Sequence, residues 1–360
     1  MRLTHLDCRT FRCLAACSFA PGRELTVIRG DNAQGKTTLL EAIHLAATTK
    51  SHRTNSDQEL AQYGSDQFHV SLAAERADRD VTIECHWWRG IKRFKVNGLA
   101  QTRLSDILGR VNVVSFSPED IGLVQGAATV RRRFLDMELS QVDPRYLQAL
   151  QRYRQALRQR NEVLRMPTPD PELLPAWDAQ LAEHGTQIMT ARAEYIGQLS
   201  GLSGEAYDRI ARDEALSLMY QPDVPAADGL LELLTRQQPS DIKRRLTQRG
   251  PHRDDLELLI AERPARIHAS QGQQKSAALA IKLAELELVR ARVGEYPVLL
   301  LDEVLAELDE RRSRRLFEAI GKGVQCIATT TEQEHRSGRF GAIYTGFRIV
   351  RGHLEEEHAS

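Results

Sequence analysis

Residues 30–37 form a glycine-rich segment that ends in a lysine and a threonine. They are Gly30, Asp31, Asn32, Ala33, Gln34, Gly35, Lys36 and Thr37, and they match the pattern G-x-x-x-x-G-K-[ST] in full. In such a loop the backbone N–H groups and a helix N-terminus cradle phosphates. The lysine binds the β- and γ-phosphate oxygens, and the hydroxyl ligates Mg²⁺. The segment therefore predicts a nucleotide site in which Lys36 also serves catalysis and Thr37 holds the metal; a chance glycine loop is the alternative.

An apolar run late in the chain ends in two carboxylates. Residues 298–303 read Val-Leu-Leu-Leu-Asp-Glu, which is typical of a buried parallel strand. Such a strand would deliver Asp302 to the Mg²⁺ ion of the phosphate loop. Glu303, one residue later, suits a general base that polarises the attacking water. An ordinary core strand followed by acidic residues is the alternative, and the phosphate loop in the same chain disfavours it.

A second candidate anion site lies just before a long helical pattern. Residues 270–275 read Ser-Gln-Gly-Gln-Gln-Lys, and a serine and a glycine at a helix N-terminus can bind an anion. Because the phosphate loop already fills its own phosphate site, Ser270 and Gly272 suit a nucleotide held by a different subunit. A plain helix cap at Ser270 is the alternative.

The elements that must position these residues follow from periodicity. Residues 25–28 predict a strand before the glycine-rich loop, and residues 36–48 predict a helix after it. Alternation predicts an antiparallel meander, whereas residues 144–165 and 177–199, joined by a proline-rich turn, predict a helical hairpin. The hairpin is either a subdomain packed on the main body or a projecting arm. Further strands are expected at 3–8, 111–116, 256–260, 297–301, 324–328 and 343–350, further helices at 274–292 and 310–320, meander strands at 68–75, 81–88 and 93–96, and a solvated tail at 355–357.

Composition limits the classes of protein. Of the 360 residues, 41% are hydrophobic and 27% charged, so wholesale disorder is excluded. Lys plus Arg (49) equals Asp plus Glu (49), which excludes a globally basic nucleic-acid coat but not local patches. Each local cluster either contacts DNA phosphates or is a solvated face; the clusters are Lys92-Arg93-Lys95, Arg131-Arg132-Arg133 and Lys243-Arg244-Arg245. No motif that reads base edges is present, so shape or junction recognition is expected.

The chain has no apolar run near the roughly 18–20 residues that span a bilayer, and its first twenty residues lack a signal-peptide core. A cytoplasmic location is therefore expected. Five cysteines in a chain of this length do not suggest a disulfide framework. Cys8, Cys13 and Cys17, with His5 nearby, match no usual zinc spacing, and small buried side chains are the expected role.

The three motifs together resemble the ABC-type ATPase heads of the SMC class. Residues 1–350 are similar, more closely, to the RecF family of bacterial recombination and gap-repair proteins. Further segments carry this resemblance: Thr10-Phe11-Arg12, Ser51-His52-Arg53-Thr54, residues 116–120, residues 132–136, residues 250–256, and Ala306-Glu307-Leu308-Asp309.

The resemblance implies an α/β fold, a P-loop ABC-type ATPase head. Lobe I, residues 1–130 and 290–360, would hold the ATPase core with a mixed sheet and the antiparallel meander. Lobe II, residues 131–289, would be mainly helical and carry the hairpin at 144–200 and the signature at 270–275.

The resemblance also implies a function. Two copies would sandwich ATP and Mg²⁺, with Lys36, Thr37, Asp302 and Glu303 from one copy and Ser270 and Gly272 from the other. Asp309 would couple the two sites, and Arg53 is a further candidate DNA contact. This ATP-dependent homodimer would bind double-stranded DNA and single-strand gap junctions without sequence specificity, hydrolyse ATP slowly, and help RecR and RecO to load RecA, away from any membrane.

Two parts of the family pattern are missing. Thr329-Thr330-Thr331 stands where a switch histidine is expected, with His335 later, and Glu119 rather than a glutamine lies in the segment of the Q-loop. Other classes therefore stay open: the ATPase subunit of a membrane transporter, a scaffold with a vestigial site, and a translocating motor. DNA-stimulated ATPase activity without a membrane fraction separates the first from the repair protein, and a nucleotide titration tests the second.

Overall fold

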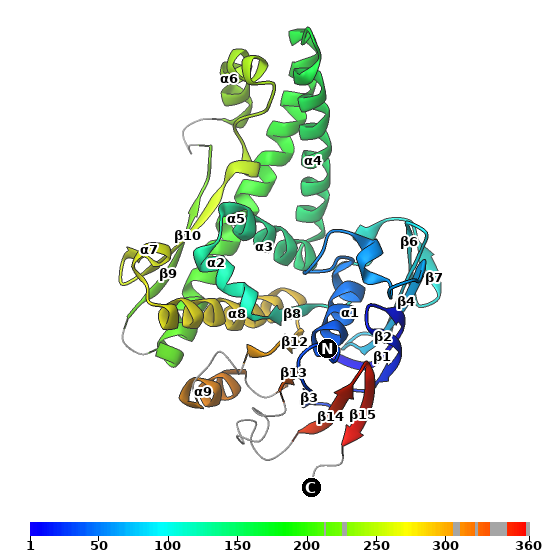
Figure 1. The fold of residues 1–360 in the computed structure, drawn as a ribbon. Coiled ribbons are helices and arrows are strands. Elements are labelled where there is room, and N and C mark those ends of the chain that lie inside the picture. Colours follow the sequence, from blue (N-terminus) through cyan, green and yellow to red (C-terminus); the bar gives the residue numbers. More distant parts are fainter. Residues whose placement is uncertain (212–213, 225–228, 305–309, 321–322, 332–343, 358–360) are drawn as a thin grey trace. The chain divides into compact units, whose positions relative to one another are not determined.

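The computed structural model describes residues 1–211, 214–224, 229–304, 310–320, 323–331 and 344–357 (Figure 1). The chain divides into two compact units. Unit 1 comprises Met1–Asp120, Glu205–Arg212 and Lys275–Ser360, and unit 2 comprises Ile121–Gly204 and Asp213–Gln274. These limits differ from those of the expected lobes, because residues 121–130 group with unit 2, and residues 205–212 and 275–289 group with unit 1. The assignment of the lobes stays a prediction.

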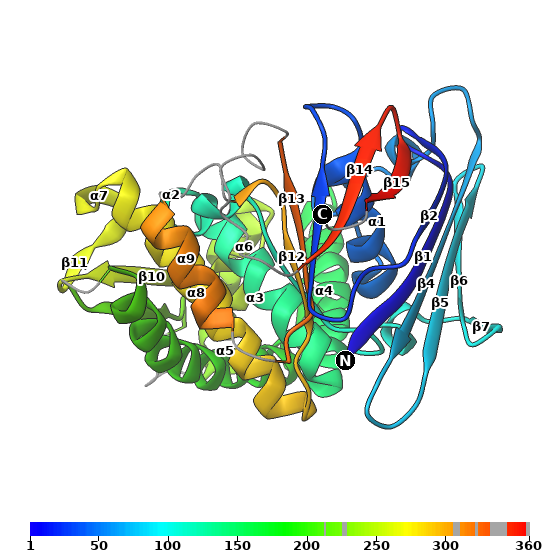
Figure 2. The same ribbon diagram turned by 90° about the horizontal axis from the view of Figure 1, so that it is seen from below.

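An antiparallel sheet of six strands forms one layer of unit 1 (Figure 2). Its strand order is β2-β1-β4-β5-β6-β7. In β5, buried Val81, Ile83, Cys85 and Trp87 alternate with more exposed residues, as expected for a sheet with one face on the core. The strands are β1 (Arg2–Phe11), β2 (Leu14–Phe19), β4 (Gln67–Glu75), β5 (Val81–Trp88), β6 (Ile91–Val96) and β7 (Leu99–Gln101).

A mixed sheet with the order β15-β14-β3-β13-β12-β8 forms the second layer of unit 1. Its strands pair in parallel from β14 to β8, and β15 pairs antiparallel at the edge. Every residue of β12 and β13 is buried, as expected for central parallel strands. The strands are β3 (Leu25–Arg29), β8 (Val113–Phe116), β12 (Val298–Leu301), β13 (Cys326–Thr330), β14 (Thr345–Val350) and β15 (His353–Glu357).

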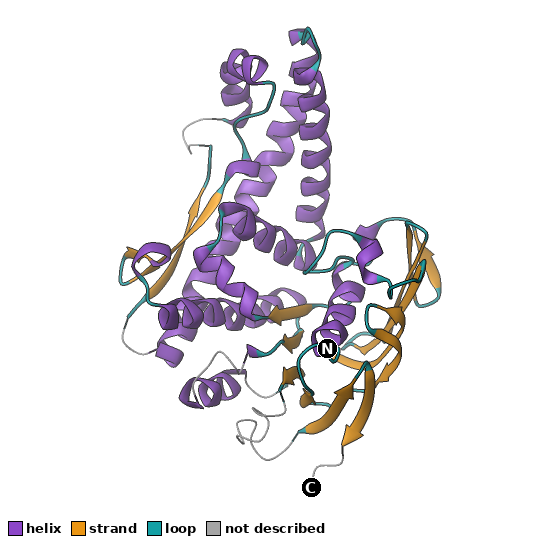
Figure 3. Cartoon of the chain, in the orientation of Figure 1, coloured by secondary structure: helices purple, strands orange, loops and turns teal. Residues whose placement is uncertain are grey.

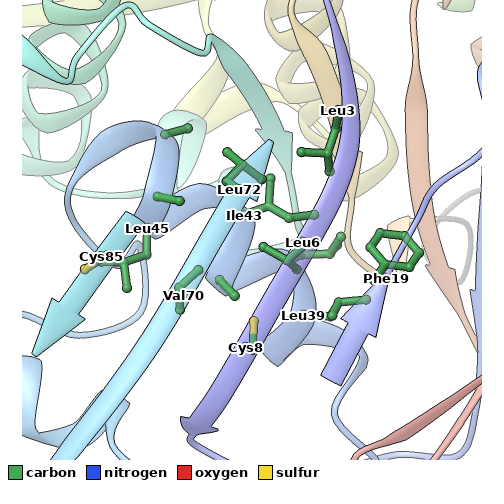
Figure 4. Close-up of a cluster of buried hydrophobic side chains, with 14 of the residues drawn as sticks. Leu3, Leu6, Cys8, Phe19, Leu39, Ile43, Leu45, Val70, Leu72 and Cys85 are labelled. Atoms are coloured by element: carbon green, nitrogen blue, oxygen red, sulfur yellow. The ribbon is translucent and has the colours of Figure 1, made fainter. Parts of the chain in front are cut away.

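Helix α1 (Lys36–Thr48) contributes to the core of both layers. One buried cluster combines Leu6 and Val70 of the antiparallel sheet, Ile43 of α1, and Ile327 and Ile349 of the mixed sheet. Figure 4 shows the side chains of β1, β4 and α1 pointing toward one another. Because α1 is buried around almost its whole circumference, the loop that precedes it is anchored to the core of the unit.

Unit 2 is mainly helical (Figure 3). A small antiparallel sheet with the order β11-β10-β9 accompanies the helices. The helices and strands of unit 2 are α2 (Gly122–Gln125), α3 (Ala128–Val142), α4 (Pro144–Arg165), α5 (Leu174–Ala211), β9 (Leu216–Gln221), α6 (Leu230–Arg244), β10 (Asp255–Ile260), β11 (Arg263–Pro264) and α7 (Ala265–His268). Helix α5 belongs to this unit as far as Gly204. The remaining helices are α8 (Gln271–Val293) and, in unit 1, α9 (Glu310–Ile320).

Two buried arginines organise the helices of unit 2. Arg160 of α4 has no exposed surface, and it donates hydrogen bonds to Asp178 at 2.5 Å and to Asp241 at 2.7 Å. Arg192 of α5 is bonded to Asp136 and Asp254, both at 2.8 Å. Each guanidinium therefore lies between two carboxylates from other elements, which satisfies a buried charge.

Most expected elements are present, and three helices, 36–48, 144–165 and 310–320, have the expected ends. In the tail at 355–357, Glu355 and Glu356 are exposed as expected, but residues 353–357 form strand β15, which the sequence analysis did not predict. The cysteines form no disulfide. Cys8 and Cys17 face each other across β1 and β2, and within the described residues no group of His, Cys, Asp and Glu side chains could hold a metal ion. Among those residues, no helix combines the length and apolar character required to cross a bilayer.

Candidate nucleotide-binding site

The backbone of the glycine-rich loop connects β3 to α1. Gly35 precedes the helix with a φ of +117° and Ala33 has a φ of +63°, so the chain bends sharply there. Glycine is also required at position 30 for space, because a Cβ there would lie 2.5 Å from the carbonyl oxygen of Ile349. The N-terminus of α1 therefore opens directly onto the loop.

The turn between β14 and β15 holds the loop in place. The backbone N–H of Arg351 donates to Oε1 of Gln34 at 2.7 Å, and the N–H of Gly352 donates to the carbonyl of Gln34 at 2.9 Å. Gln34 thus fixes the loop to the edge of the mixed sheet. The sequence analysis did not predict this contact. Gln34 occupies a variable position of the motif, and nothing in the residues near the end of the chain indicates that they would bind the loop.

The ammonium of Lys36 is buried at the mouth of the loop. The exposed fraction of the Lys36 side chain is 2%, and that of the Glu303 side chain is 33%. Oε1 of Glu303 lies 3.0 Å from Nζ of Lys36. The ammonium also donates to the carbonyl oxygens of Gly30 at 2.7 Å and Asp31 at 2.9 Å. The structure therefore brings together Lys36 and Glu303, the two residues predicted to act in catalysis.

The two predicted metal ligands also meet. Thr37 donates from Oγ1 to Oδ1 of Asp302 at 3.1 Å. Thr329 donates to the same oxygen at 2.8 Å and accepts from the N–H of Glu303 at 2.9 Å. Burial raises the pKa of Asp302, and the bonds from Thr329 and Thr37 oppose that shift. Thr329, at the position where a histidine was expected, therefore orients both acidic residues.

A cavity of about 240 Å³ opens in front of these residues. It is lined by Cys13, Asn32, Ala33, Gly35, Lys36, Thr37, Thr38, Arg53 and Glu303. Backbone N–H groups, one ammonium and one guanidinium suit the phosphates of a nucleotide, and a hydroxyl next to a carboxylate suits Mg²⁺, which binds few protein ligands besides phosphate. The residues present therefore fit ATP and Mg²⁺.

Arg53 belongs to the nucleotide cavity, whereas the sequence suggested it as a DNA contact. Glu41 of α1, which has no exposed surface, accepts from Arg12 at 2.8 Å, from Ser51 at 2.5 Å and from Arg53 at 3.4 Å. Glu41 thereby ties two segments, one at Arg12 and one at residues 51–53, to the helix that follows the loop. The sequence analysis missed Glu41 and the cavity position of Cys13, since neither belongs to a motif.

His52 lies next to this cluster. Its ring centroid is 5.0 Å from that of His44. Burial lowers the pKa of His52, while the charges of Glu41, Asp302 and Glu119 act in the opposite direction. His335, the histidine that the sequence analysis named for the switch, lies outside the described residues.

Ser270 and Gly272 belong to unit 2. The N–H of Ser270 donates to Oε1 of Gln273 at 2.7 Å, and the N–H of Gln273 donates to Oγ of Ser270 at 3.3 Å. This reciprocal pair is a capping box. Within one chain, Ser270 therefore acts as the helix cap that the sequence analysis gave as the alternative. Ser270 is exposed, and its role toward a second copy stays a prediction. Residues 306–309, including Asp309, lie outside the described part of the chain.

The three basic clusters differ in what they expose. Lys92 donates to Asp57 at 2.5 Å and to the carbonyl of Thr49 at 3.1 Å, and Arg131 is buried against Asp255. The exposed members are Arg93, Lys95, Arg133, Lys243, Arg244 and Arg245. Arg131 therefore serves the fold of unit 2 rather than its surface.

Comparison with known proteins identifies the family of the chain. The family model of the RecF/RecN/SMC N-terminal domain matches residues 2–340. The chain belongs to this RecF family. It is 42% identical to the DNA replication and repair protein RecF of Symbiobacterium thermophilum, over 93% of this chain and 92% of that protein. RecF of Latilactobacillus sakei subsp. sakei is 36% identical over the full length of both chains.

Solved structures agree with the RecF assignment. A structure of the recombination mediator protein RecF with ATP, of the RecFOR pathway, has a TM-score of 0.91 at 32% identity, and the match covers 99% of this chain and 98% of that one. The SMC head bound to the C-terminal winged-helix domain of ScpA has a TM-score of 0.60 at 16% identity over 99% and 97%, which shows a shared fold. The expected RecF membership and the α/β ATPase-head fold are thus confirmed.

Proposed function

We propose that this RecF-family chain is an ATP-dependent DNA-binding protein of recombinational gap repair, and that ATP drives its dimerisation on DNA. It acts with RecR and RecO in loading RecA, and slow hydrolysis of ATP releases it. The family membership and the RecF–ATP relative support the proposal, and the convergence of Lys36, Thr37, Asp302 and Glu303 at one cavity carries it.

In this proposal each residue of the cavity has one task. Lys36 and the N–H groups of residues 30–37 bind phosphate oxygens, and Thr37 and Asp302 hold Mg²⁺ between them. The ion supplies charge neutralisation on the phosphates. Glu303 accepts a proton from water, since its carboxylate already lies beside Lys36 at the cavity. Ser270 and Gly272 at the start of α8 bind the phosphates held by the other copy.

ATP acts as the switch because it is bound from both sides only in the closed dimer, and a ligand shifts an equilibrium only through such differential affinity. The DNA contacts are phosphate contacts by exposed basic side chains, so the affinity falls as salt rises. Candidate contacts are Arg93 and Lys95 in unit 1 and Lys243, Arg244 and Arg245 in unit 2.

The first experiment measures binding of a short labelled DNA duplex by fluorescence anisotropy with ATP, with ADP and without nucleotide. Binding that requires ATP and weakens with salt is expected. Equal binding in all three states would contradict the ATP switch, and the absence of binding would favour a protein that needs its partner or the transporter alternative.

A charge placed at Ser270 tests the role of the second copy. Ser270→Arg should leave ATP binding by the monomer within about twofold while abolishing ATP-dependent dimerisation, because its bulk and charge lie between protomers. Ser217→Arg, at another exposed serine of unit 2, is the matched control. Sedimentation velocity with ATP separates them, and normal dimerisation of Ser270→Arg would remove Ser270 from the interface.

A neutral residue at Glu303 tests the catalytic base. Glu303→Gln keeps the size of the side chain but removes the proton acceptor, so ATP turnover should fall by roughly two to four powers of ten. The ATP-bound dimer should accumulate. Turnover at the rate of the unaltered chain would exclude Glu303 as the base.

A further inference from the structure

The antiparallel sheet of unit 1 has a second face, opposite the one that packs on α1. In β4 and β5, buried residues alternate with residues that are partly or fully exposed, as expected when one face of a sheet meets solvent. Figure 2 shows β1, β4, β5 and β6 side by side. The residues of β4 and β5 on this outer face include 69, 71, 73, 82, 84, 86 and 88, and none of them is buried.

A row of basic side chains crosses four strands on the outer face. Arg9 of β1 lies opposite His69 of β4. His69 lies opposite His86 of β5, and the ring centroids of the two histidines are 6.4 Å apart. Arg93 of β6 lies opposite His86. Because neighbouring strands are about 4.8 Å apart, this Arg–His row spans roughly 14 Å and has an arginine at each end.

The two arginines of the Arg–His row are available to a ligand. Both Arg9 and Arg93 are exposed. Among the residues that the structure describes, neither guanidinium makes an ion pair or a hydrogen bond. Burial lowers the pKa of His69; the charge of Glu84 opposes this shift, and those of His86 and Arg9 add to it. The row therefore presents two guanidinium groups with imidazole rings between them.

The outer face differs on the two sides of the Arg–His row. On one side, Trp88 of β5 lies opposite Ile91 of β6, and these residues are 46% and 50% exposed. On the other side, Glu84 of β5 lies opposite Lys95 of β6, and Asp7 of β1 follows in the same line. A polyanion that lies along the row would therefore be repelled from the carboxylate side and would meet apolar surface on the side of Trp88.

The indole of Trp88 has a cation beside it. The guanidinium of Arg89 lies 5.3 Å from the centroid of the Trp88 ring, within the range of a cation–π attraction. Asp66 binds Nε of Arg89 at 2.7 Å, so this guanidinium is held in place. Exposed aromatic surface is unfavourable in water, and a nucleic-acid base that stacks on the indole would cover it.

We propose that this outer face binds single-stranded DNA, with phosphates at Arg9 and Arg93 and a base stacked on Trp88. Proteins that hold single strands combine a basic track with aromatic side chains on which bases stack. The bases of a duplex stack on one another and are not free to cover an indole. A chain of phosphates that carries planar rings therefore matches both the Arg–His row and its apolar side. The proposal rests on the DNA-binding function proposed above and assigns the single strand to one surface.

The first test removes the charges of the Arg–His row. Anisotropy measures binding of fluorescein-labelled oligothymidylate to the full chain over a range of salt concentrations, with and without ATP. Arg9→Gln/Arg93→Gln is compared with Arg152→Gln/Arg158→Gln, which removes two exposed charges from α4. The first variant should bind at least about tenfold more weakly at low salt, and the second within about twofold of the unaltered chain. The salt slope of log affinity should become shallower by about 1.4 for two lost single-strand phosphate contacts.

The second test removes the stacking surface. Trp88→Ala should weaken oligothymidylate binding roughly 5- to 100-fold and should leave the affinity for a duplex within about twofold. Trp88→Phe keeps an aromatic ring and should retain most of the affinity. Leu173→Ala, at a residue of unit 2 that is 47% exposed, is the matched control. Oligothymidylate should also quench the tryptophan fluorescence of the unaltered chain, and Trp88→Phe should abolish that quenching.

The outcomes separate this proposal from the proposed function. Duplex binding that requires ATP, together with no binding of oligothymidylate, would overturn the single-strand surface alone. Absence of all DNA binding would overturn both. Equal losses in the two double-arginine variants, or equal losses for duplex and single strand in Trp88→Ala, would also overturn the single-strand surface. A polyglutamate peptide that binds as tightly as oligothymidylate, with the same loss in Arg9→Gln/Arg93→Gln, would identify an acidic protein as the occupant instead.

Discussion

Buried cations occur in both units, but their surroundings differ. In unit 1 the ammonium of Lys36 contacts two backbone carbonyls and one carboxylate, and that carboxylate belongs to the partly exposed Glu303. In unit 2 the guanidinium of Arg160 lies between Asp178 and Asp241, both buried. The partners of Lys36 are weak and can be replaced. Arg160 instead has a buried carboxylate on each side.

The difference separates a binding charge from a structural one. A cation whose partners are neutral carbonyls and one partly exposed carboxylate can exchange them for phosphate oxygens at small cost. A cation between two buried carboxylates cannot, because moving it would leave two uncompensated charges. The same reasoning places Arg192, which lies between Asp136 and Asp254, with the structural cations of unit 2.

The largest expected effect is on the structural cation. Arg160→Met removes the guanidinium and leaves Asp178 and Asp241 buried together, so the free energy of unfolding of unit 2 should fall by about 3–5 kcal/mol. The chain has three tryptophans, and Trp177, which packs on the cluster next to Arg160, is the one in unit 2. Fluorescence of Trp177 during urea unfolding, in a chain with Trp87→Phe and Trp88→Phe, measures the change.

The triple variant Arg160→Met, Asp178→Asn, Asp241→Asn is the control. It removes the charges together and should regain most of the lost stability. A loss below about 1 kcal/mol for Arg160→Met would show that water reaches the carboxylates, and the distinction between the two cations would fail.

The second effect is on the binding cation. Lys36→Met should weaken ATP binding roughly 100-fold, because a charge directed at the phosphates is lost. It should change the free energy of unfolding by less than about 1 kcal/mol, since the ammonium leaves no buried carboxylate unpaired. Equilibrium titration with a fluorescent ATP analogue and urea unfolding of the same sample give both quantities. A loss of stability similar to that of Arg160→Met would place Lys36 with the structural cations.

The sequence predicts unit 1 well because its signals are local. The glycine-rich loop, the apolar run at 298–301 and the helix at 36–48 each show their structure within a few residues. Strand β2 (Leu14–Phe19) was missed because its small residues, Ala15, Ala16 and Cys17, show little alternation. Strand β15 was missed because a run of glutamates at a sheet edge has the composition of a solvated tail.

The contacts that complete the nucleotide site and the ion pairs of unit 2 come from positions that are distant in the sequence. Thr329 reaches Asp302 only because β12 and β13 pair in parallel, and Arg53 reaches the nucleotide cavity through Glu41. In unit 2, Arg131 and Asp255 are 124 residues apart, and no periodicity indicates that pairing. Local patterns therefore identify the nucleotide site, whereas the buried ion pairs of unit 2 are seen only in the folded chain.

The smallest expected effect is the pH dependence of stability that comes from His252, a buried histidine near the cations of unit 2. His252 bonds to the hydroxyl of Tyr153 at 2.7 Å and to the carbonyl of Thr247 at 3.1 Å. Burial lowers its pKa below 6.5; the carbonyl of Thr247 opposes this, and the charge of Arg253 adds to it. Below about pH 6.5 the unfolded chain therefore binds a proton that the folded chain does not.

The free energy of unfolding of unit 2 should consequently fall as the pH drops from 7.5 toward 5.5, by at most about 1.4 kcal/mol per pH unit for this one proton. Urea unfolding followed by Trp177 at several pH values measures the slope. His252→Gln should reduce it, whereas His268→Gln, at an exposed position, should not. His52 and His69, whose pKa values burial also lowers, are present in both variants, so the difference between their slopes reports on His252. Equal slopes would mean that His252 is protonated in the folded chain as readily as in the unfolded chain. The positive charges around it would then not keep it neutral.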